Sequence, residues 1–279
     1  MEFLQALRLS IIINKKVNAI NRKVRKEQKY GSNFANFKIK CTHTMNKIIE
    51  NVRRDFIRNG DEKTKLSGER YFKEEVKLYG IKSALARQIS KDHYKMLHDK
   101  SKSHIFSLCE EFWQSGYIEE SFVACDWSYN MRKNFVQADF KVFQKWVNNY
   151  VNNWASCDTF CNHTVGTFVE MYPSFLSGLK EWAKSDNRWV KRASAVSLIV
   201  PARKGKFLKD IFEIADILHS DKDDMVQKGY GWMLKAASQA YQHQVFDYVI
   251  SKKATMPRTS LRYAIEKMPM ELKAKAMSK

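Results

Sequence analysis

The sequence predicts an all-α protein, an α-solenoid built from repeated pairs of helices with a concave face. The 279 residues include only 4 Pro and 10 Gly, too few to mark the turns of an all-β chain. Apolar residues recur with the helical period along most of the chain. Small residues recur in every second predicted helix, with steps of 35, 36, 36 and 33 residues, at Ala124, Thr159, Ala195, Gly231 and Ala264. A period in the thirties made of two helices is typical of a solenoid.

Residues 1–44 differ in composition from the rest, with ten basic residues against two acidic ones. The apolar run Leu9–Ile13 is too short for a signal-peptide core and lacks a small-residue cleavage site after it. Three interpretations remain: a disordered basic arm, an organellar transit segment, or sequence upstream of a true start at Met45. We favour the last, because a regular helical pattern begins directly after Met45. We therefore expect an extension over 1–44 and a single domain over 45–279.

The predicted domain opens with a helix that Gly60 ends, and its apolar face holds Ile48, Ile49, Val52, Phe56 and Ile57. Gly80 is expected to cap the C-terminus of a later helix. The next helix is basic, and its Arg87, Lys91 and Lys95 are equally compatible with a solvated face and with phosphate contacts. Short helices in pairs then follow, with apolar positions at Ile105–Trp113, Phe122–Trp127, Phe140–Val151, Leu176–Trp182, Trp189–Ile199, Phe207–Leu218, Met225–Leu234, Val245–Ile250 and Leu261–Ile265.

The charge balance indicates a polyanionic partner. The net charge is +19, with 49 Lys+Arg against 30 Asp+Glu, and nucleic acid is the simplest polyanion to match it. A membrane surface is the competing one, but no apolar run approaches the roughly 18 residues of a transmembrane helix, so we expect no membrane partner. The 5 cysteines are odd in number and scattered, which favours a reducing compartment. We expect a cytoplasmic protein, or an organellar or nuclear one if the source is eukaryotic.

The stretch Asn152–Asp158 holds the strongest candidate site. Trp154 and Asp158 are four residues apart, which places an indole and a carboxylate on one face of a helix. The alternative is a buried tryptophan followed by an aspartate that caps a helix. In a solenoid the equivalent helices line one wall, so Lys191-Arg192 and Trp232, on the next two of these helices, would face the same space. That wall would suit a cationic ligand held near a polyanion.

Other constellations are weaker. Cys157, Cys161 and His163 are spaced closely enough to suggest zinc, but no second pair has ligand spacing, and cysteine is commonly buried. No Gly-rich phosphate loop is present. We expect neither a metal nor a cofactor.

Five short stretches have an order and spacing that match a known family together. They are Arg70–Lys73 with Leu78–Ile81, Asn153-Trp154 with Asp158, Ser185–Ala193, Leu218–Lys222 and Gln227–Leu234. Through them the chain from about Met45 to Lys279 resembles the AlkD-type DNA alkylation repair enzymes, HEAT-like repeat glycosylases that remove alkylated purines. The resemblance departs from the family at Ala155, where an acid is often seen, and at the unusually basic stretch Ala202–Lys206.

The resemblance implies a function and roles for particular residues. It implies a monofunctional alkylpurine DNA glycosylase, acting as a monomer on duplex DNA and excising cationic N3- or N7-alkylated purines without flipping the base into a pocket. Asp158 would be the catalytic carboxylate. Trp154 and Trp232 would form aromatic walls, and Tyr71 would be a further aromatic residue on the lesion side. Arg192 would contact a backbone phosphate, with Lys191 beside it.

Two other functions compete with this one. The first is a catalytically silent solenoid that binds structured nucleic acid, and the second is a protein-interaction scaffold. The basic surplus disfavours the scaffold. Retention of Asp158 beside Trp154 disfavours the silent binder.

Overall fold

The structure is a computed structural model that describes residues 47–278; the predicted extension over 1–44 lies outside the described residues. One compact unit begins at Val52 and runs to the end of the chain. Within the described residues this unit consists of helices and loops, without a β-sheet, and its one isolated bridge joins Lys77 to Tyr117. None of the described helices is both long and apolar enough to cross a membrane.

The helices are short, and most are separated by loops of a few residues. After a helix that ends at residue 59, they are α2 (Glu62–Glu69), α3 (Ser83–Met96), α4 (Lys102–Ser115), α5 (Ile118–Asn130), α6 (Asp139–Asn149), α7 (Trp154–Phe160), α8 (Gly166–Met171), α9 (Leu176–Ala183), α10 (Arg188–Val196), α11 (Ile199–Arg203), α12 (Leu208–Leu218), α13 (Asp224–Ala237), α14 (Gln242–Lys252), α15 (Arg258–Ile265) and α16 (Met270–Met277).

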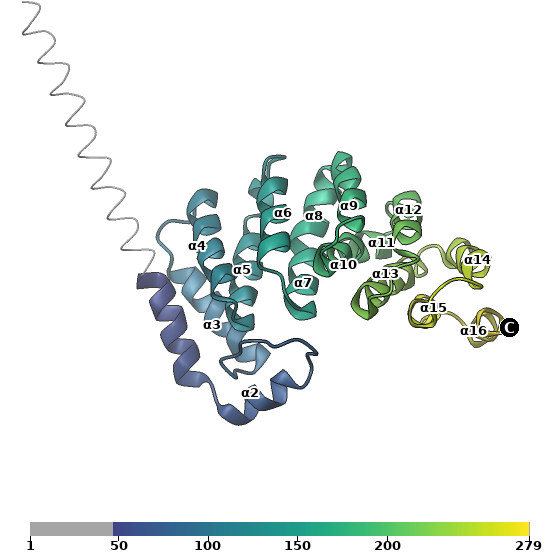
Figure 1. The fold of residues 1–279 in the computed structure, drawn as a ribbon. Helices are drawn as coiled ribbons and strands as arrows, with labels where there is room; N and C mark the ends of the chain where they lie inside the picture. The colour runs from purple at the N-terminus through teal and green to yellow at the C-terminus, as the bar shows by residue number, and fades with distance from the viewer. Residues whose placement is uncertain (1–46, 279) are drawn as a thin grey trace, which may run out of the picture. The chain divides into compact units, whose positions relative to one another are not determined.

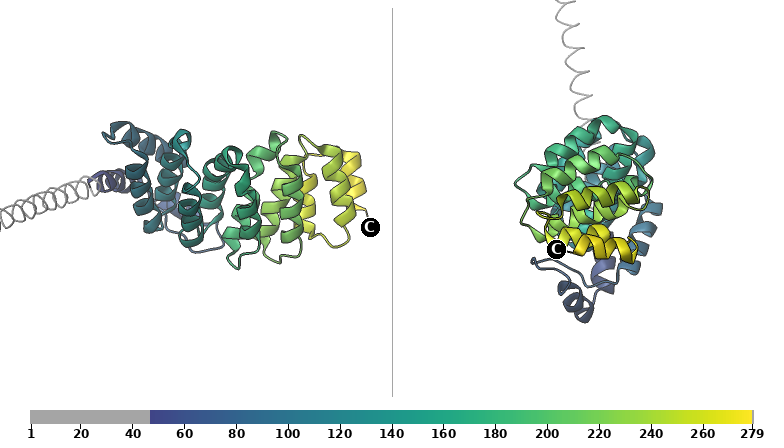
Figure 2. Two further views of the ribbon diagram at one scale, coloured as in Figure 1. Left: turned by 90° about the horizontal axis from the view of Figure 1, so that it is seen from above. Right: turned by 90° about the vertical axis from the view of Figure 1, so that its right-hand side faces the viewer.

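From α3 onward the helices stack in two rows, which confirms the predicted all-α solenoid (Figures 1 and 2). One row, called the inner row here, contains α3, α5, α7, α10, α13 and α15, each packed on the next. The five small residues that recur in the sequence all lie on inner-row helices, from Ala124 on α5 to Ala264 on α15. The sequence period therefore corresponds to one step along the inner row.

Close packing of neighbouring inner helices explains why these positions are small. A Cβ atom on Gly231 of α13 would lie 2.7 Å from the Cβ of Tyr263 and 2.9 Å from the carbonyl oxygen of Ser260, both on α15. Ala124, Ala195 and Ala264 are fully buried. Larger side chains at these points would push adjacent helices apart.

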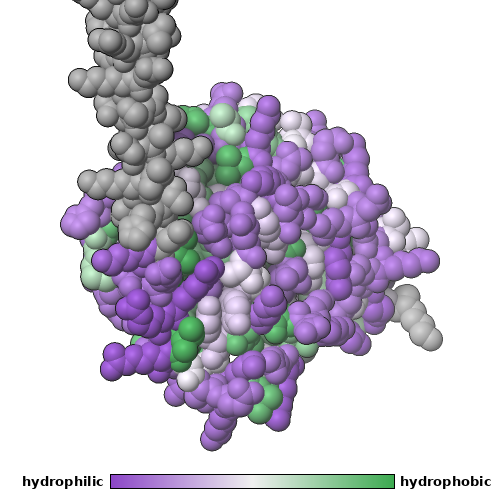
Figure 3. All heavy atoms as spheres, turned by 60° about the vertical axis from the view of Figure 1, so that its left-hand side comes forward, coloured by the Kyte–Doolittle hydropathy of each residue, from purple (hydrophilic) through white to green (hydrophobic). Residues whose placement is uncertain are grey.

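Aromatic residues fill the core. Phe143, Trp146, Phe160 and Phe168 are fully buried and pack as a cluster with ring centroids 5.6–6.1 Å apart in their successive contacts. These residues come from α6, α7 and α8, so the cluster joins several pairs of helices. Figure 3 shows one face of the protein, where hydrophilic residues predominate and hydrophobic ones form small separate patches.

The segment 70–76, called the strap here, follows α2 without being helical and leads toward α3, the first helix of the inner row. Gly80 follows it in a loop with φ of +84°, so the prediction of a helix C-terminal cap at Gly80 is wrong, although the left-handed backbone is real. The buried carboxylate of Glu119 fixes this loop by accepting hydrogen bonds from the backbone N–H of Tyr79 and of Gly80, at 3.1 and 3.0 Å.

A π-helical turn over Cys161–Val165 follows α7 directly and leads into α8. A π turn holds one more residue than an α turn, and such turns are frequent at functional sites. The first residue of α8 is Gly166, where a Cβ atom would lie 2.7 Å from the carbonyl oxygen of Ser197. The turn thus ends where two backbones approach closely.

Candidate active site

Helix α7 places Trp154 and Asp158 one turn apart, as the sequence predicts. The helix begins at Trp154 because Asn153 caps it: the Asn153 side chain accepts a hydrogen bond from the Ser156 N–H at 2.9 Å. Asp158 is therefore not a helix cap, and its carboxylate is available for another role. Its side chain is 15% exposed.

Arg192 holds the Asp158 carboxylate from the neighbouring helix α10. Nε donates to Oδ1 at 2.9 Å and Nη2 donates to Oδ2 at 2.8 Å, a two-point contact that fixes the plane of the carboxylate. Nη1 donates to the carbonyl oxygen of Met225 at 2.5 Å. Burial raises the pKa of Asp158, and the Arg192 guanidinium opposes that rise. The Asp158 carboxylate is thus a nearly enclosed anion whose orientation is fixed by Arg192.

The space for Arg192 is provided by helix α13. A Cβ atom on Gly229 would lie only 3.2 Å from Cγ of Arg192, so the missing side chain lets the arginine pass along α13 to Met225. Only 5% of Arg192 is exposed. The phosphate contact that the sequence predicts for Arg192 stays a prediction. Its burial, and the acceptors it already has on Asp158 and Met225, favour a role toward the carboxylate.

The indole of Trp154 is held by the strap. Its ring stacks on Phe72 with centroids 5.3 Å apart and an angle of 20° between the planes. Its Nε1–H donates to the carbonyl oxygen of Tyr71 at 3.2 Å. Tyr71 itself is 74% exposed and so is free to meet a ligand. Sequence reasoning gave Phe72 no role, although it lies within the stretch that carries the family resemblance.

Trp232 lies on α13, half-buried, about two turns beyond Met225. Residues spaced by three, four and seven share one side of a helix, so Trp232 lies on the same side as Met225 and Gly229, which face Arg192. Helix geometry therefore predicts that Trp232 lies toward the side of α13 that faces Arg192, and its role as the second aromatic wall stays a prediction.

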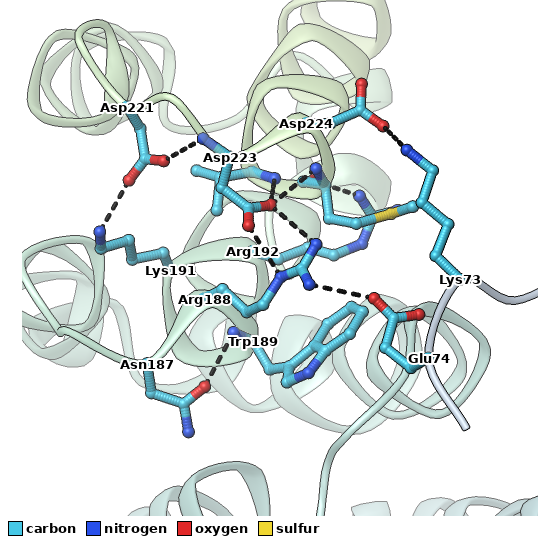
Figure 4. Close-up of polar contacts among 12 residues, drawn as sticks. Lys73, Glu74, Asn187, Arg188, Trp189, Lys191, Arg192, Asp221, Asp223 and Asp224 are labelled. Carbon is cyan, nitrogen blue, oxygen red and sulfur yellow. Dashed lines mark hydrogen bonds and ion pairs between the residues drawn. The ribbon is translucent and has the colours of Figure 1, made fainter. Parts of the chain in front are cut away.

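A cluster of ion pairs surrounds the start of α13 (Figure 4). Lys191, a predicted DNA-binding residue, donates to Asp221 at 2.7 Å. Arg188 lies between two acids, with Nη1 3.0 Å from Glu74 of the strap and Nε 2.9 Å from Asp223. Lys73 of the strap lies 3.2 Å from Asp224. Sequence reasoning missed this cluster, because Glu74 and Arg188 are 114 residues apart.

A cavity of about 690 Å³ lies beside Trp154, between α2, the strap, α3, α5 and α7. Tyr71, Phe72, Phe122 and Trp154 line it, together with apolar and lysine side chains. Asp158 does not line it, so the carboxylate and this cavity are separate features.

The three residues that could have suggested zinc do not converge. Cys157 and Cys161 are buried, and the Cys157 thiol donates to the carbonyl oxygen of Trp189. His163 is exposed and packs on Tyr129. Among the described residues, no group of three or more His, Cys, Asp or Glu side chains is arranged to hold a metal ion.

The sequence profile described as "DNA alkylation repair enzyme" matches residues 52–268, which include every residue of the site. The chain belongs to this family of DNA alkylation repair enzymes. Family membership supports a role in the repair of alkylated DNA and an enzymatic function. No curated protein sequence matches the chain.

One solved structure has the same fold. It is a protein from Enterococcus faecalis described as a predicted DNA alkylation repair enzyme, with a TM-score of 0.68 and 18% sequence identity. The match covers 76% of this chain and 98% of the other. At this identity the likeness establishes the fold, and the chemistry of the site has to be argued from its own residues.

Proposed function

We propose that this DNA alkylation repair enzyme is a monofunctional glycosylase that excises cationic N3- or N7-alkylated purines from duplex DNA. The observation that carries the proposal is the pairing on α7 of a nearly enclosed carboxylate, Asp158, with an indole one turn away, Trp154. Arg192 orients the first and the strap orients the second. Both groups suit a substrate that is positively charged before and during the reaction.

The chemistry needs little more than this carboxylate. An alkylated purine with a positive charge leaves as a neutral base, taking the electron pair of the C1′–N bond, so no acid has to protonate it. Positive charge then grows on the sugar, where the Asp158 carboxylate stabilises it. Water adds to C1′ and gives up its proton to Asp158, which passes it to solvent. Electrostatic and general-base help of this kind contributes roughly 10²–10⁴-fold in rate.

Arg192 keeps the carboxylate ready for this role. A buried acid tends to take up a proton, and an uncharged Asp158 would neither stabilise the sugar nor accept the proton of water. The guanidinium favours the ionised form and fixes both oxygens by its two hydrogen bonds. We therefore propose that Arg192 positions Asp158, whether or not it also contacts a phosphate.

The aromatic residues supply recognition of the lesion. A cationic base is attracted to an indole face by about 0.5–2 kcal/mol, depending on how far both are desolvated. Phe72 already covers one face of Trp154, so the lesion would meet its remaining face or edge. Trp232 and the exposed Tyr71 are the further aromatic contacts in this proposal. We expect the enzyme to act as a monomer and to need no cofactor.

Release of the free base from duplex DNA containing N7-methylguanine tests the proposal. The wild-type protein should release it, and Asp158→Asn should reduce the single-turnover rate by about 10²-fold or more while leaving duplex affinity unchanged or slightly higher. If the wild-type protein releases no alkylated purine, it is a nucleic-acid binder without this activity. If Asp158→Asn is as fast as wild type, the carboxylate has another role.

The structure adds a control to this experiment. Asp158→Asn leaves a buried arginine without its anion, and breaking a buried ion pair costs up to about 3–5 kcal/mol. The double variant Asp158→Asn/Arg192→Gln removes both charges, so it should unfold at a higher denaturant concentration than the single variant. Both variants should be inactive while folded, which separates loss of the carboxylate from loss of the fold.

A further inference from the structure

Trp154 and the carboxylate of Asp158 are connected by a second route, a series of side-chain and backbone contacts, in addition to helix α7, which carries both residues. Starting from Trp154, the route passes to the strap through Phe72 and the Tyr71 carbonyl. The strap carboxylate of Glu74 accepts a hydrogen bond from Arg188 at 3.0 Å. The strap is thereby tied to helix α10, beyond its contact with α7.

Arg188 continues the route to the first turn of α13. Its Nη2 donates to Oδ1 of Asp223 at 3.1 Å, and its Nε lies 2.9 Å from Oδ2. Asp223 is also the N-cap of α13, because the same Oδ1 accepts from the N–H of Met225 at 2.8 Å and of Val226 at 3.3 Å. One aspartate therefore both anchors Arg188 and shapes the start of the helix (Figure 4).

The route closes at the carboxylate. The N–H of Met225 donates to Asp223, and the carbonyl oxygen of Met225 accepts a hydrogen bond from Nη1 of Arg192. The other two nitrogens that Arg192 uses hold Asp158. The contacts thus form a closed ring that leaves α7 at Trp154 and returns to it at Asp158.

We infer that Arg188 is a positioning residue for base excision, which sets the strap and the start of α13 so that Trp154 and Asp158 keep their mutual geometry. The inference rests on the proposed function and extends it to residues that touch neither lesion nor sugar. Reacting groups that shift by about 1 Å can lose on the order of 10²-fold in rate, so a loosened ring should slow excision without removing any reacting group.

A competing role for Arg188 is direct binding of a DNA phosphate, since its side chain is 36% exposed. The two roles differ in what Glu74 does. If Arg188 binds phosphate, Glu74 competes with DNA, and removing its charge should tighten binding and leave the rate intact or faster. If Arg188 positions the site, removing the charge of Glu74 should loosen the ring and slow excision.

The test compares Glu74→Gln and Arg188→Gln with Glu75→Gln, the exposed neighbour of Glu74 on the strap. With enzyme in excess over duplex containing N7-methylguanine, Glu74→Gln and Arg188→Gln should each release base about tenfold more slowly, and their double variant no more slowly than the slower single one. Glu74→Gln should bind undamaged duplex within about twofold of wild type. Glu75→Gln should match wild type throughout.

Hydrogen exchange of the protein without DNA gives a second readout. Glu74→Gln and Arg188→Gln should speed exchange in the strap and in the first turn of α13, residues 224–228, and Glu75→Gln should not. Wild-type rates with unchanged exchange in both variants would overturn the inference. The inference would also be overturned if the losses in base-release rate of the two single variants added up in the double variant. It would likewise be overturned if Glu74→Gln bound duplex more tightly and released base at the wild-type rate. If wild-type protein releases no base while exchange responds as expected, the proposed function fails and the structural ring stands alone.

Discussion

Arg192 donates hydrogen bonds to both oxygens of Asp158, and only 5% of the arginine and 15% of the aspartate side chain are exposed. This pair makes the ionisation of Asp158 depend on Arg192. Burial raises the pKa of the carboxyl, and the guanidinium is the charge that opposes the rise. A change at Arg192 should therefore show itself in the dependence of base release on pH.

The first prediction concerns Arg192→Gln. Without the guanidinium the pKa of Asp158 rises further, so a smaller fraction of the carboxyl is ionised at any given pH. Because the ionised form is the active one, the acid limb of the pH–rate profile should move to higher pH, and activity should partly return as pH is raised. Single-turnover release across pH, corrected for spontaneous base loss, measures this. Arg203→Gln, at an exposed cation on α11, should leave the profile unchanged.

The pH dependence of stability in Arg192→Gln should run opposite to that of its activity: the variant should come closer to wild-type stability as pH falls. In Arg192→Gln, protonation of Asp158 removes an uncompensated buried charge, and its pKa is raised above that of the unfolded chain. The deficit in unfolding free energy relative to wild type should therefore shrink as pH falls through the raised pKa and grow as pH increases. A deficit that is constant with pH would show that Asp158 and Arg192 do not interact in solution as they do here.

The second prediction concerns the two indoles. Trp154→Ala and Trp232→Ala should weaken recognition of a cationic alkylated purine by about 0.5–2 kcal/mol each, because each removes a π-face. Affinity for undamaged duplex should change much less. Trp154→Phe and Trp232→Phe keep an aromatic face and should recover part of the difference. Equal losses on damaged and undamaged duplex would point to a general DNA contact instead.

A third prediction separates phosphate contacts from positioning residues by salt. Affinity for duplex DNA should fall by about 0.9 log units per log unit of salt for each phosphate neutralised. Replacing an exposed cation on α3, as in Arg87→Gln or Lys91→Gln, should reduce this slope if α3 faces DNA. Arg192→Gln should leave it unchanged if Arg192 serves only Asp158. A reduced slope for Arg192→Gln would restore the phosphate contact predicted from sequence.

The fourth prediction concerns the packing of inner-row helices. Gly231→Ala would place its new methyl group against the backbone of α15, so it should destabilise the protein by about 1–3 kcal/mol in denaturant unfolding. Gly68→Ala on α2 would meet only a flexible leucine side-chain methyl, at 3.0 Å. That control should leave the free energy of unfolding nearly unchanged. An equal loss of unfolding free energy in both variants would contradict the tight α13–α15 contact.

Much of the architecture is predictable because local patterns determine it. The small residues at Ala124, Ala195 and Ala264 mark buried contacts between successive inner helices, and their spacing reports the repeat before any coordinates are known. The four-residue step from Trp154 to Asp158 likewise fixes their common face, because the helical period does so in any α-helix.

Other features depend on information that local patterns lack. Gly80 has the left-handed backbone that a helix cap requires, but an irregular loop can require it as well, and the sequence does not separate the two. An arginine near acids can face solvent or be enclosed, so the burial of Arg192 was not foreseeable. The contact between Glu74 and Arg188 joins residues 114 apart, which no periodicity can report.

The π turn at Cys161–Val165 has a consequence for the angular phase of the helix that carries the site. Each residue of an α-helix advances about 100° around the axis, so one additional residue in the turn rotates everything after it by that amount relative to Trp154 and Asp158. The rotation brings Gly166, which has no side chain, to the carbonyl of Ser197, where a Cβ atom would lie only 2.7 Å away. Deleting one residue from the turn would leave the indole and the carboxylate in place but present the wrong side of α8 to its neighbours. The orientation of Trp154 and Asp158 on α7 is therefore set independently of the face that α8 packs against its neighbours.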